Sequence, residues 1–165
     1  MTAPGAIRHD VPMPTPDPAA APRVSLRPLD EPGIERLLQV ALADADPEDV
    51  MPPGWSTDAQ FRAFYRGMPA FEVLVDGRTA GMARLTDDGE TGMWLAKSAR
   101  GAGVGKAVLR LVLAQATRAG LRAVLADTTS DNAAALAVLR ASGAALRVEG
   151  DRVLAELPLS DTPDA

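Results

Sequence analysis

Residues 100–106, RGAGVGK, place an arginine, three alternating glycines and a lysine at the start of an apolar segment. Glycines let a backbone approach a ligand closely, and successive backbone N–H groups at the start of a helix attract anions such as phosphate. The same glycines can also serve only the geometry of a turn between a strand and a helix. The segment is therefore a candidate phosphate-binding loop, with an ordinary turn as the alternative.

Two common phosphate-binding motifs do not fit these letters. A Walker A loop, G-x-x-x-x-G-K-[ST], would need glycine at Arg100 and serine or threonine at Ala107. A dinucleotide-binding G-x-G-x-x-G motif would need its third glycine at Lys106 or at Val108, depending on the glycine that begins it. The pattern that remains is R-x-x-G-x-G, formed by Arg100 and the last two glycines.

The residue types present exclude several other chemistries. The chain contains no cysteine, so disulfides, thiolate metal ligands and a cysteine nucleophile are excluded. Its only histidine, His9, lies in the proline-rich segment 1–22, which argues against a histidine-based triad and a zinc site. No metal is therefore predicted.

Charge and hydropathy narrow the class of protein. The formal net charge is −5, which argues against nucleic acid as a partner. No apolar run approaches the roughly 20 residues that span a bilayer, and no signal peptide is visible, so we expect a cytoplasmic protein without membrane contact. Heavy use of alanine and of arginine over lysine indicates a GC-rich bacterial genome.

The length of 165 residues is typical of one domain. Segment 1–22 carries six prolines and few large apolar residues, which predicts a flexible tail before a domain at 23–165. Periodicity and turn residues predict an α/β fold with a mixed sheet. The expected elements are strand 23–29, helix 31–45, a loop at 44–55, a short helix after residue 56, strands 70–78, 79–90 and 91–97, helix 103–119, strand 121–127, helix 130–143 and a hairpin at 144–159. Strand 121–127 is almost continuously apolar, which is typical of a buried parallel strand.

Three stretches together resemble the GNAT superfamily of acetyl-CoA-dependent N-acetyltransferases. The R-x-x-G-x-G pattern at 100–105 is similar to the family's acyl-CoA signature, [RQ]-x-x-G-x-[GA]. The segment NAAALAVLRASGA resembles the family's last helix, with Asn132 and Gly143 in register. The stretch MWLAKSARGAG resembles the Y-W-L strand found in the branch that acetylates protein N-termini and related amines. The resemblance covers roughly residues 24–158.

The resemblance implies a single GNAT-like domain, in which a mixed, mostly antiparallel sheet of about seven strands has a splayed central parallel pair and about four helices. It also implies acetyl-CoA as co-substrate and direct attack of an amine on the thioester within a ternary complex. Backbone N–H groups at the end of strand 91–97 would bind pantetheine and polarise the thioester carbonyl. Asn132 would also bind pantetheine, with a helix cap as its alternative role. The implied cofactor-binding residues are Leu95, Ala96, Lys97, Arg100, Gly101, Ala102, Gly103, Val104, Gly105, Lys106 and Asn132.

Proton transfer is less well defined by the resemblance. Many family members carry a tyrosine acid on the last helix, where this chain has Leu139. Water or the only tyrosine, Tyr65, remains as the acid, although core packing is the simpler role for Tyr65. For the base the resemblance points to Asp127, with Glu90 second and Glu72 third. An ordinary surface aspartate is the alternative for Asp127.

The acceptor pocket of this superfamily is usually bounded by the loop between the first two helices and by the final hairpin. Here that loop combines acidic side chains with Trp55, which favours a cationic amine, and a merely solvated loop is the alternative. The predicted function is N-acetylation of a primary amine, either a small cationic amine or a protein N-terminus. A non-catalytic acyl-CoA-binding regulatory module is the alternative function, and a homodimer stays open. The acidic residues concerned are Asp44, Asp46, Glu48 and Asp49.

Overall fold

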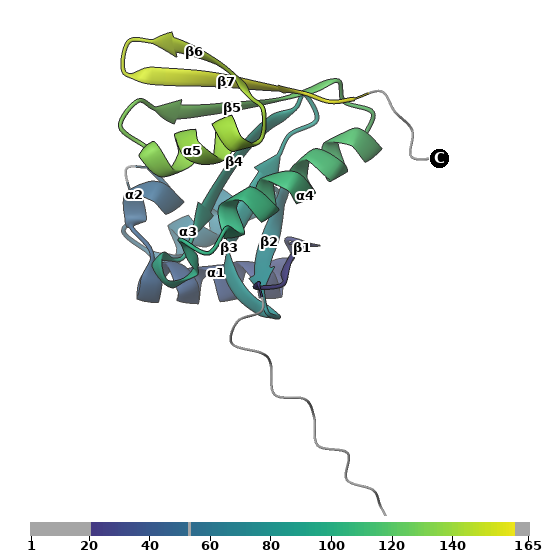
Figure 1. Cartoon of the computed structure of the whole chain (residues 1–165). Coiled ribbons are helices and arrows are strands. Elements are labelled where there is room, and N and C mark those ends of the chain that lie inside the picture. Colours follow the sequence, from purple (N-terminus) through teal and green to yellow (C-terminus); the bar gives the residue numbers. More distant parts are fainter. Residues whose placement is uncertain (1–20, 53, 161–165) are drawn as a thin grey trace, which may run out of the picture.

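The computed structural model describes residues 21–52 and 54–160 (Figure 1). The predicted tail at 1–22 lies almost wholly outside the described residues, as do residues 161–165 of the predicted domain. The elements in chain order are β1 (Val24–Pro28), α1 (Glu31–Asp44), α2 (Pro47–Val50), α3 (Asp58–Tyr65), β2 (Ala70–Val75), β3 (Arg78–Leu85), β4 (Glu90–Leu95), the 3-10 helix η1 (Lys97–Ala99), α4 (Val104–Arg118), β5 (Ala123–Thr129), α5 (Ala133–Ala141), β6 (Ala145–Glu149) and β7 (Arg152–Pro158). Apart from α2 and η1, this order confirms the predicted one.

The described residues form five α-helices, one more than predicted. The additional helix is α2, which occupies part of the segment 44–55 that the sequence predicted as a loop. Pro47 stands in its first turn, where proline's fixed φ suits a helix. Glu48 and Asp49 follow, and negative side chains stabilise the start of a helix.

All seven strands belong to one sheet, in the order β1-β2-β3-β4-β5-β7-β6. Every neighbouring pair is antiparallel except β4 and β5, which are parallel. The parallel pairing is confined to Glu90 opposite Leu125 and Thr91 opposite Ala126. β4 continues to Leu95 and β5 continues to Thr129, but the two strands make no further pairing with each other and therefore separate. The predicted splayed parallel pair is confirmed.

The helices cover the two faces of the sheet unequally (Figure 1). α1 and α3 pack on β2, β3 and β4 through a cluster that includes Leu37, Phe61 and Trp94. On the opposite face, α4 spans both halves of the sheet, and α5 packs beside it on the half formed by β5 and β7. Among the described residues, the face that carries α1 and α3 has no helix packed over β5, β7 and β6.

This arrangement corrects the prediction that strand 121–127 is buried on both sides. Val124 is fully buried under α4, but the next residue, Leu125, is 45% exposed. Successive side chains of a strand point to opposite faces, and only one face of β5 is covered by helices. The apolar run therefore reflects one packed face and one open apolar face.

Candidate functional site

The loop between η1 and α4 presents a run of unused backbone donors. Within the described part of the chain, the N–H groups of residues 101–106 donate no hydrogen bond to protein, and the first helical bond runs from Ala107 N–H to Gly103 O at 3.1 Å. The positive end of the α4 dipole lies at the same place. Backbone donors at a helix N-terminus form an anion site without any special side chain.

The three glycines of this loop have two different structural roles. Gly101 has φ +90° and Gly103, the N-cap of α4, has φ +77°, a region that side chains with a Cβ rarely adopt. Gly105 lies inside α4, where an added Cβ would lie 3.5 Å from Val138 Cγ2 of α5. The first two glycines therefore shape the loop, whereas at Gly105 a Cβ would make only an ordinary van der Waals contact with α5.

The end of β4 directs backbone groups into the gap between β4 and β5. Ala96 N–H donates to Ala80 O of β3 at 2.7 Å. Because the N–H groups of an extended strand alternate between its two edges, Leu95 directs its own N–H and C=O away from β3, toward the gap. Arg100 Nε donates to Leu95 O at 3.1 Å, so this arginine lies at the mouth of the gap.

Three of the acidic residues predicted to face an acceptor contact the segment 97–100, at the predicted cofactor-binding residues. Asp44 Oδ2 accepts from the backbone N–H of Ser98 at 3.1 Å and from the Ser98 hydroxyl, and these hydrogen bonds lower the pKa of Asp44. Two ion pairs accompany this contact, Lys97 Nζ to Asp46 Oδ1 at 3.0 Å and Arg100 Nη2 to Asp49 Oδ2 at 3.5 Å. These two cations compensate two of the four acidic side chains, which weakens the charge argument for a cationic acceptor.

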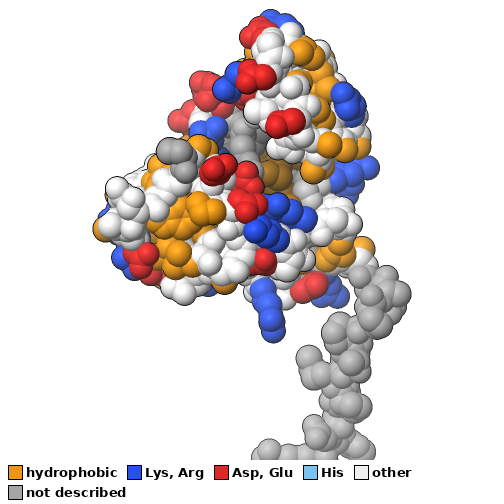
Figure 2. Space-filling view, turned by 90° about the vertical axis from the view of Figure 1, so that its left-hand side faces the viewer, with side chains coloured by type: hydrophobic (Ala, Val, Ile, Leu, Met, Phe, Trp, Pro, Cys, Tyr) orange, Lys and Arg blue, Asp and Glu red, His pale blue; other side chains and the backbone are white. Residues whose placement is uncertain are grey.

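Figure 2 views the end of the molecule that carries α2 in Figure 1. Acidic and basic side chains lie side by side near the middle of this view, at the lower edge of a hollow. The segment 44–49 and the segment 97–100 are thus held together next to the start of α4.

Asn132 occupies the position of a helix cap. Its Oδ1 accepts from Ala135 N–H at 3.1 Å at the start of α5, which is the alternative role considered from the sequence. Its amide nitrogen makes no hydrogen bond to a described residue, so a donor remains for a ligand. The cap bonds stabilise a helix end by roughly 1 kcal/mol.

The two preferred base candidates line one depression on the open face of the sheet. Asp127 and Glu90 border this depression, which has a volume of about 460 Å³. Asp127 is 42% exposed and is bonded to Arg152 of β7, whereas the Glu90 carboxylate has no ion pair among the described residues. The depression is lined by Arg84, Glu90, Thr91, Leu125, Ala126, Asp127, Ala145, Leu146, Arg147, Leu154, Ala155 and Glu156.

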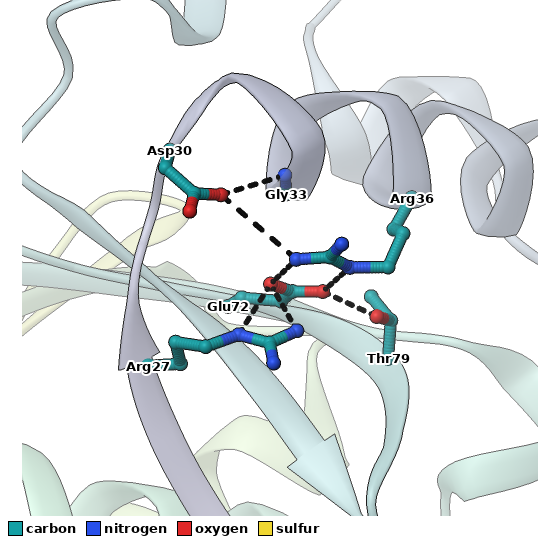
Figure 3. Close-up of polar contacts among 6 residues, drawn as sticks. All are labelled: Arg27, Asp30, Gly33, Arg36, Glu72 and Thr79. Atoms are coloured by element: carbon teal, nitrogen blue, oxygen red, sulfur yellow. Dashed lines mark hydrogen bonds and ion pairs between the residues drawn. The ribbon is translucent and has the colours of Figure 1, made fainter.

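Glu72, the third candidate, lies under α1 and away from this depression (Figure 3). Its side chain is 0% exposed and accepts hydrogen bonds from Arg27, Arg36 and Thr79. Burial acts to raise its pKa, but the hydrogen bonds from Arg36, Thr79 and Arg27 outweigh burial and lower it to about 2. Glu72 therefore serves the packing of α1 on the sheet.

Tyr65 is also buried, and its hydroxyl is already hydrogen-bonded to other residues. Its side chain is buried, its hydroxyl donates to Val50 O, and it accepts from Trp94 Nε1 at 3.0 Å. Burial raises the pKa of Tyr65 to about 12, although the hydrogen bond from Trp94 acts in the opposite direction. Leu139, at the position of the family's tyrosine, is buried in the core beside α4. Neither residue is placed as a general acid.

Sequence reasoning missed Arg84, Glu156 and Arg152, which surround the same depression or its aspartate. The alternation of polar and apolar residues in the final hairpin was a signal that one of its faces is open. The sequence contains no signal that shows which residues of neighbouring strands lie opposite each other.

Within the described residues, no group of three or more potential metal ligands occurs. No helix of residues 21–52 and 54–160 is both long and apolar enough to cross a bilayer.

The fold and the loop between η1 and α4 indicate the class of protein, and the comparison with known families agrees. The chain belongs to the GNAT acetyltransferase family, because the profile described as "Acetyltransferase (GNAT) family" matches residues 34–144. A search of curated protein sequences found no match.

Solved structures of acetyltransferases share the fold at low sequence identity. YncA from Salmonella typhimurium, solved with its cofactor acetyl-CoA, is 20% identical with a TM-score of 0.63, covering 86% of this chain and 98% of its own. RimL, a ribosomal L7/L12 alpha-N-protein acetyltransferase in complex with coenzyme A, is 18% identical with a TM-score of 0.69, covering 82% and 94%. A GNAT-family acetyltransferase from Bacillus anthracis is 16% identical with a TM-score of 0.70, covering 84% and 96%.

Proposed function

We propose that this protein transfers an acetyl group from acetyl-CoA to a primary amine. The observation that carries the proposal is the run of unbonded N–H groups at 101–106, at the start of α4 and beside the gap between β4 and β5. A pyrophosphate fits such a run because it needs several donors and positive charge. Structures similar to this one were solved with acetyl-CoA or coenzyme A, which supports the choice of ligand.

Acetyl-CoA supplies the thioester that an amine attacks. In the proposed complex the backbone of residues 101–106 holds the pyrophosphate, with Arg100 and Lys106 adding positive charge. Residues 95–97 bind the pantetheine arm along the edge of β4. The Leu95 N–H, directed into the gap, is the proposed donor to the thioester carbonyl. The free amide nitrogen of Asn132 is the proposed donor from the α5 side.

The proposed proton acceptor is Asp127, with Glu90 as the second candidate. Both carboxylates line the depression: Glu90 lies in the paired part of β4 and β5, and Asp127 follows the last paired residue of β5, where the two strands begin to separate. Asp127 commits one oxygen to Arg152, and its other oxygen remains for the ammonium or a bridging water. For the proton donor to the departing thiolate we propose water, because the Tyr65 hydroxyl is buried and bonded to Val50 and Trp94, and Leu139 has no titratable group.

Substitutions of Asp127 and Glu90 test which of the two carboxylates accepts the proton. We expect Asp127→Asn to lower kcat by about 100-fold or more if it accepts the proton, since general-base catalysis contributes about 10²–10⁴-fold. Glu90→Gln should then have a smaller effect, and the reverse order would transfer the role to Glu90. Asp151→Asn, at the exposed turn between β6 and β7, is the matched control and should leave kcat unchanged.

The acceptor predicted from the sequence is a small cationic amine or a protein N-terminus. The ion pairs of Asp46 and Asp49 weaken the charge argument for a small cationic amine. RimL, which shares the fold, is described as an alpha-N-protein acetyltransferase, which supports an α-amine as the acceptor group.

The experiment that tests the function is thiol release from acetyl-CoA against a panel of primary amines, combined with calorimetric titration of coenzyme A. Binding together with amine-dependent thiol release is the expected result. Binding without release across the panel would favour the alternative, a non-catalytic acyl-CoA-binding module. The test includes this alternative because Leu139 stands where many family members carry the tyrosine acid. No binding of coenzyme A would refute both.

A further inference from the structure

Arg84 is a charged side chain of the open depression to which the proposed function assigns no role. It stands on β3 opposite Gly92 of β4, in the register of the sheet. Its Nη2 and Nε lie 3.6 and 4.0 Å from the point where a Cβ of Gly92 would stand. The guanidinium therefore lies across Gly92, at ordinary van der Waals distance from the place of a Cβ. It lines the depression together with Glu90 and Asp127.

Arg84 combines partial burial with the lack of a carboxylate partner among the described residues. No carboxylate of the described residues lies within 4.0 Å of its guanidinium, whereas Arg147 and Arg152, on the same face of the sheet, pair with Glu149 and Asp127. The other arginines without a carboxylate partner in the described part of the chain are exposed, whereas Arg84 is half-buried. A half-buried guanidinium has lost part of its hydration and gains from an anionic partner.

The charges around Arg84 are arranged in two rows across the strands. In one row, Leu125 has Glu90 opposite it on β4 and Glu156 opposite it on β7. Neither of these two carboxylates has an ion pair among the described residues. Arg84 belongs to the next row, over Gly92. The depression thus offers a positive site beside a negative one, which matches a ligand that carries both an ammonium and a carboxylate group.

We propose that Arg84 binds a carboxylate of the acceptor, so that the acceptor is an amino acid or a similarly small amine that carries a carboxylate. A planar guanidinium binds a carboxylate through two parallel hydrogen bonds, which adds orientation to charge. The ammonium group of the same molecule then lies among the carboxylates of the depression, which include Asp127 and Glu90, the proposed proton acceptors. A volume of about 460 Å³ admits a ligand of this size. This proposal rests on the proposed acetyltransferase function and makes Arg84 a specificity-determining residue.

The test compares amino acids with their own amides, which differ at the carboxylate. Thiol release from acetyl-CoA is measured with L-alanine, L-leucine and L-phenylalanine, with the amide of each, and with putrescine. We expect the wild-type protein to prefer each acid to its amide, although the amine of an amide is less basic and more often uncharged at neutral pH. Putrescine should be the poorest acceptor because it offers Arg84 no anionic group.

Arg84→Gln should lower kcat/KM for the acids by about 10- to 100-fold, because a hydrogen bond to a charged group contributes roughly 1.5–3 kcal/mol. The loss should come mainly from KM, and the amides should change less than threefold. Arg84→Lys keeps the charge and should restore part of the loss. Arg78→Gln, at the exposed start of the same strand, is the matched control and should change neither substrate class.

The outcomes separate the two proposals. Equal or better turnover of the amides by the wild-type protein overturns the role of Arg84 and leaves the acetyltransferase function standing. An equal loss for acids and amides in Arg84→Gln also overturns it, because a selective contact would affect only the acids. Failure of every amine to release thiol overturns the proposed function and this inference together. If Arg84→Gln does not fold, the wild-type ranking and Arg84→Lys decide.

Discussion

Replacing Glu72 with glutamine should destabilise the protein and remove part of its response to acid. Glu72 is a fully buried carboxylate between α1 and the sheet, bonded to two arginines and to Thr79 (Figure 3). The substitution keeps the size and one acceptor oxygen, but leaves Arg27 without a carboxylate partner and Arg36 with only Asp30, at 3.9 Å. Both guanidinium groups are partly exposed, so water limits the cost of the unpaired cations.

The expected magnitude follows from the pKa of Glu72. Its pKa falls from 4.5 to about 2 on folding, which corresponds to about 3 kcal/mol of stability at neutral pH. A carboxyl whose folded-state pKa is lowered contributes stability above its unfolded pKa and loses it as the pH falls through the folded value. The contribution of Glu72 is therefore complete above about pH 5 and disappears between about pH 5 and pH 2.

The assay is urea unfolding of the wild type and of Glu72→Gln at several pH values between 3 and 7. We expect the variant to lose about 2–3 kcal/mol at pH 7 and the two curves to converge as the pH is lowered. Glu35→Gln is the matched control, because Glu35 forms an exposed pair with Arg62 at 2.5 Å and should cost less than about 1 kcal/mol. A variant as stable as the wild type at pH 7, or a difference independent of pH, would refute the reasoning.

Three further predictions test the assignments around the site. Tyr65→Phe should lower stability by about 1–2 kcal/mol, because the hydrogen bonds of its buried hydroxyl are lost, while the pH profile of turnover stays unchanged; a shifted profile would make Tyr65 an acid. Gly103→Ala should weaken coenzyme A binding in a calorimetric titration, because φ is +77° there, whereas Gly105→Ala should bind nearly as the wild type does; equal losses would contradict separate roles for these glycines. Asp44→Ala should raise KM for acetyl-CoA more than KM for the amine, because Asp44 holds Ser98 beside the cofactor loop; the opposite split would return the acidic segment to acceptor recognition.

The loop at 100–106 could be predicted because its determinants are local. A glycine with positive φ, a helix start and a preceding strand all depend on neighbouring residues, and the printed letters contain them in order. The order of strands and helices was predictable for the same reason, since periodicity and turn residues act over a few positions. The parallel pair at the centre of the sheet followed from the family resemblance.

The short helix α2 and the open face of β5 could not be predicted in this way. Four residues are too few for a helical period to emerge, so Pro47 and the acidic residues after it were indistinguishable from a loop. The exposure of Leu125 depends on which faces of the sheet the helices cover. That coverage is a property of packing between distant segments, and an apolar strand looks the same with one covered face or two.

The sequence by itself determined the family, the order of the elements and the position of the candidate cofactor loop, because contiguous residues encode each of these. Only the tertiary structure decided what the charged side chains contact. Asp44 accepts a hydrogen bond from Ser98, and Glu72 accepts one from Arg36. Arg84 lies over Gly92 without a carboxylate partner among the described residues. Such pairs depend on strand register and on the seating of helices over the sheet. The choice of acceptor therefore rests on contacts that no local pattern in the chain contains.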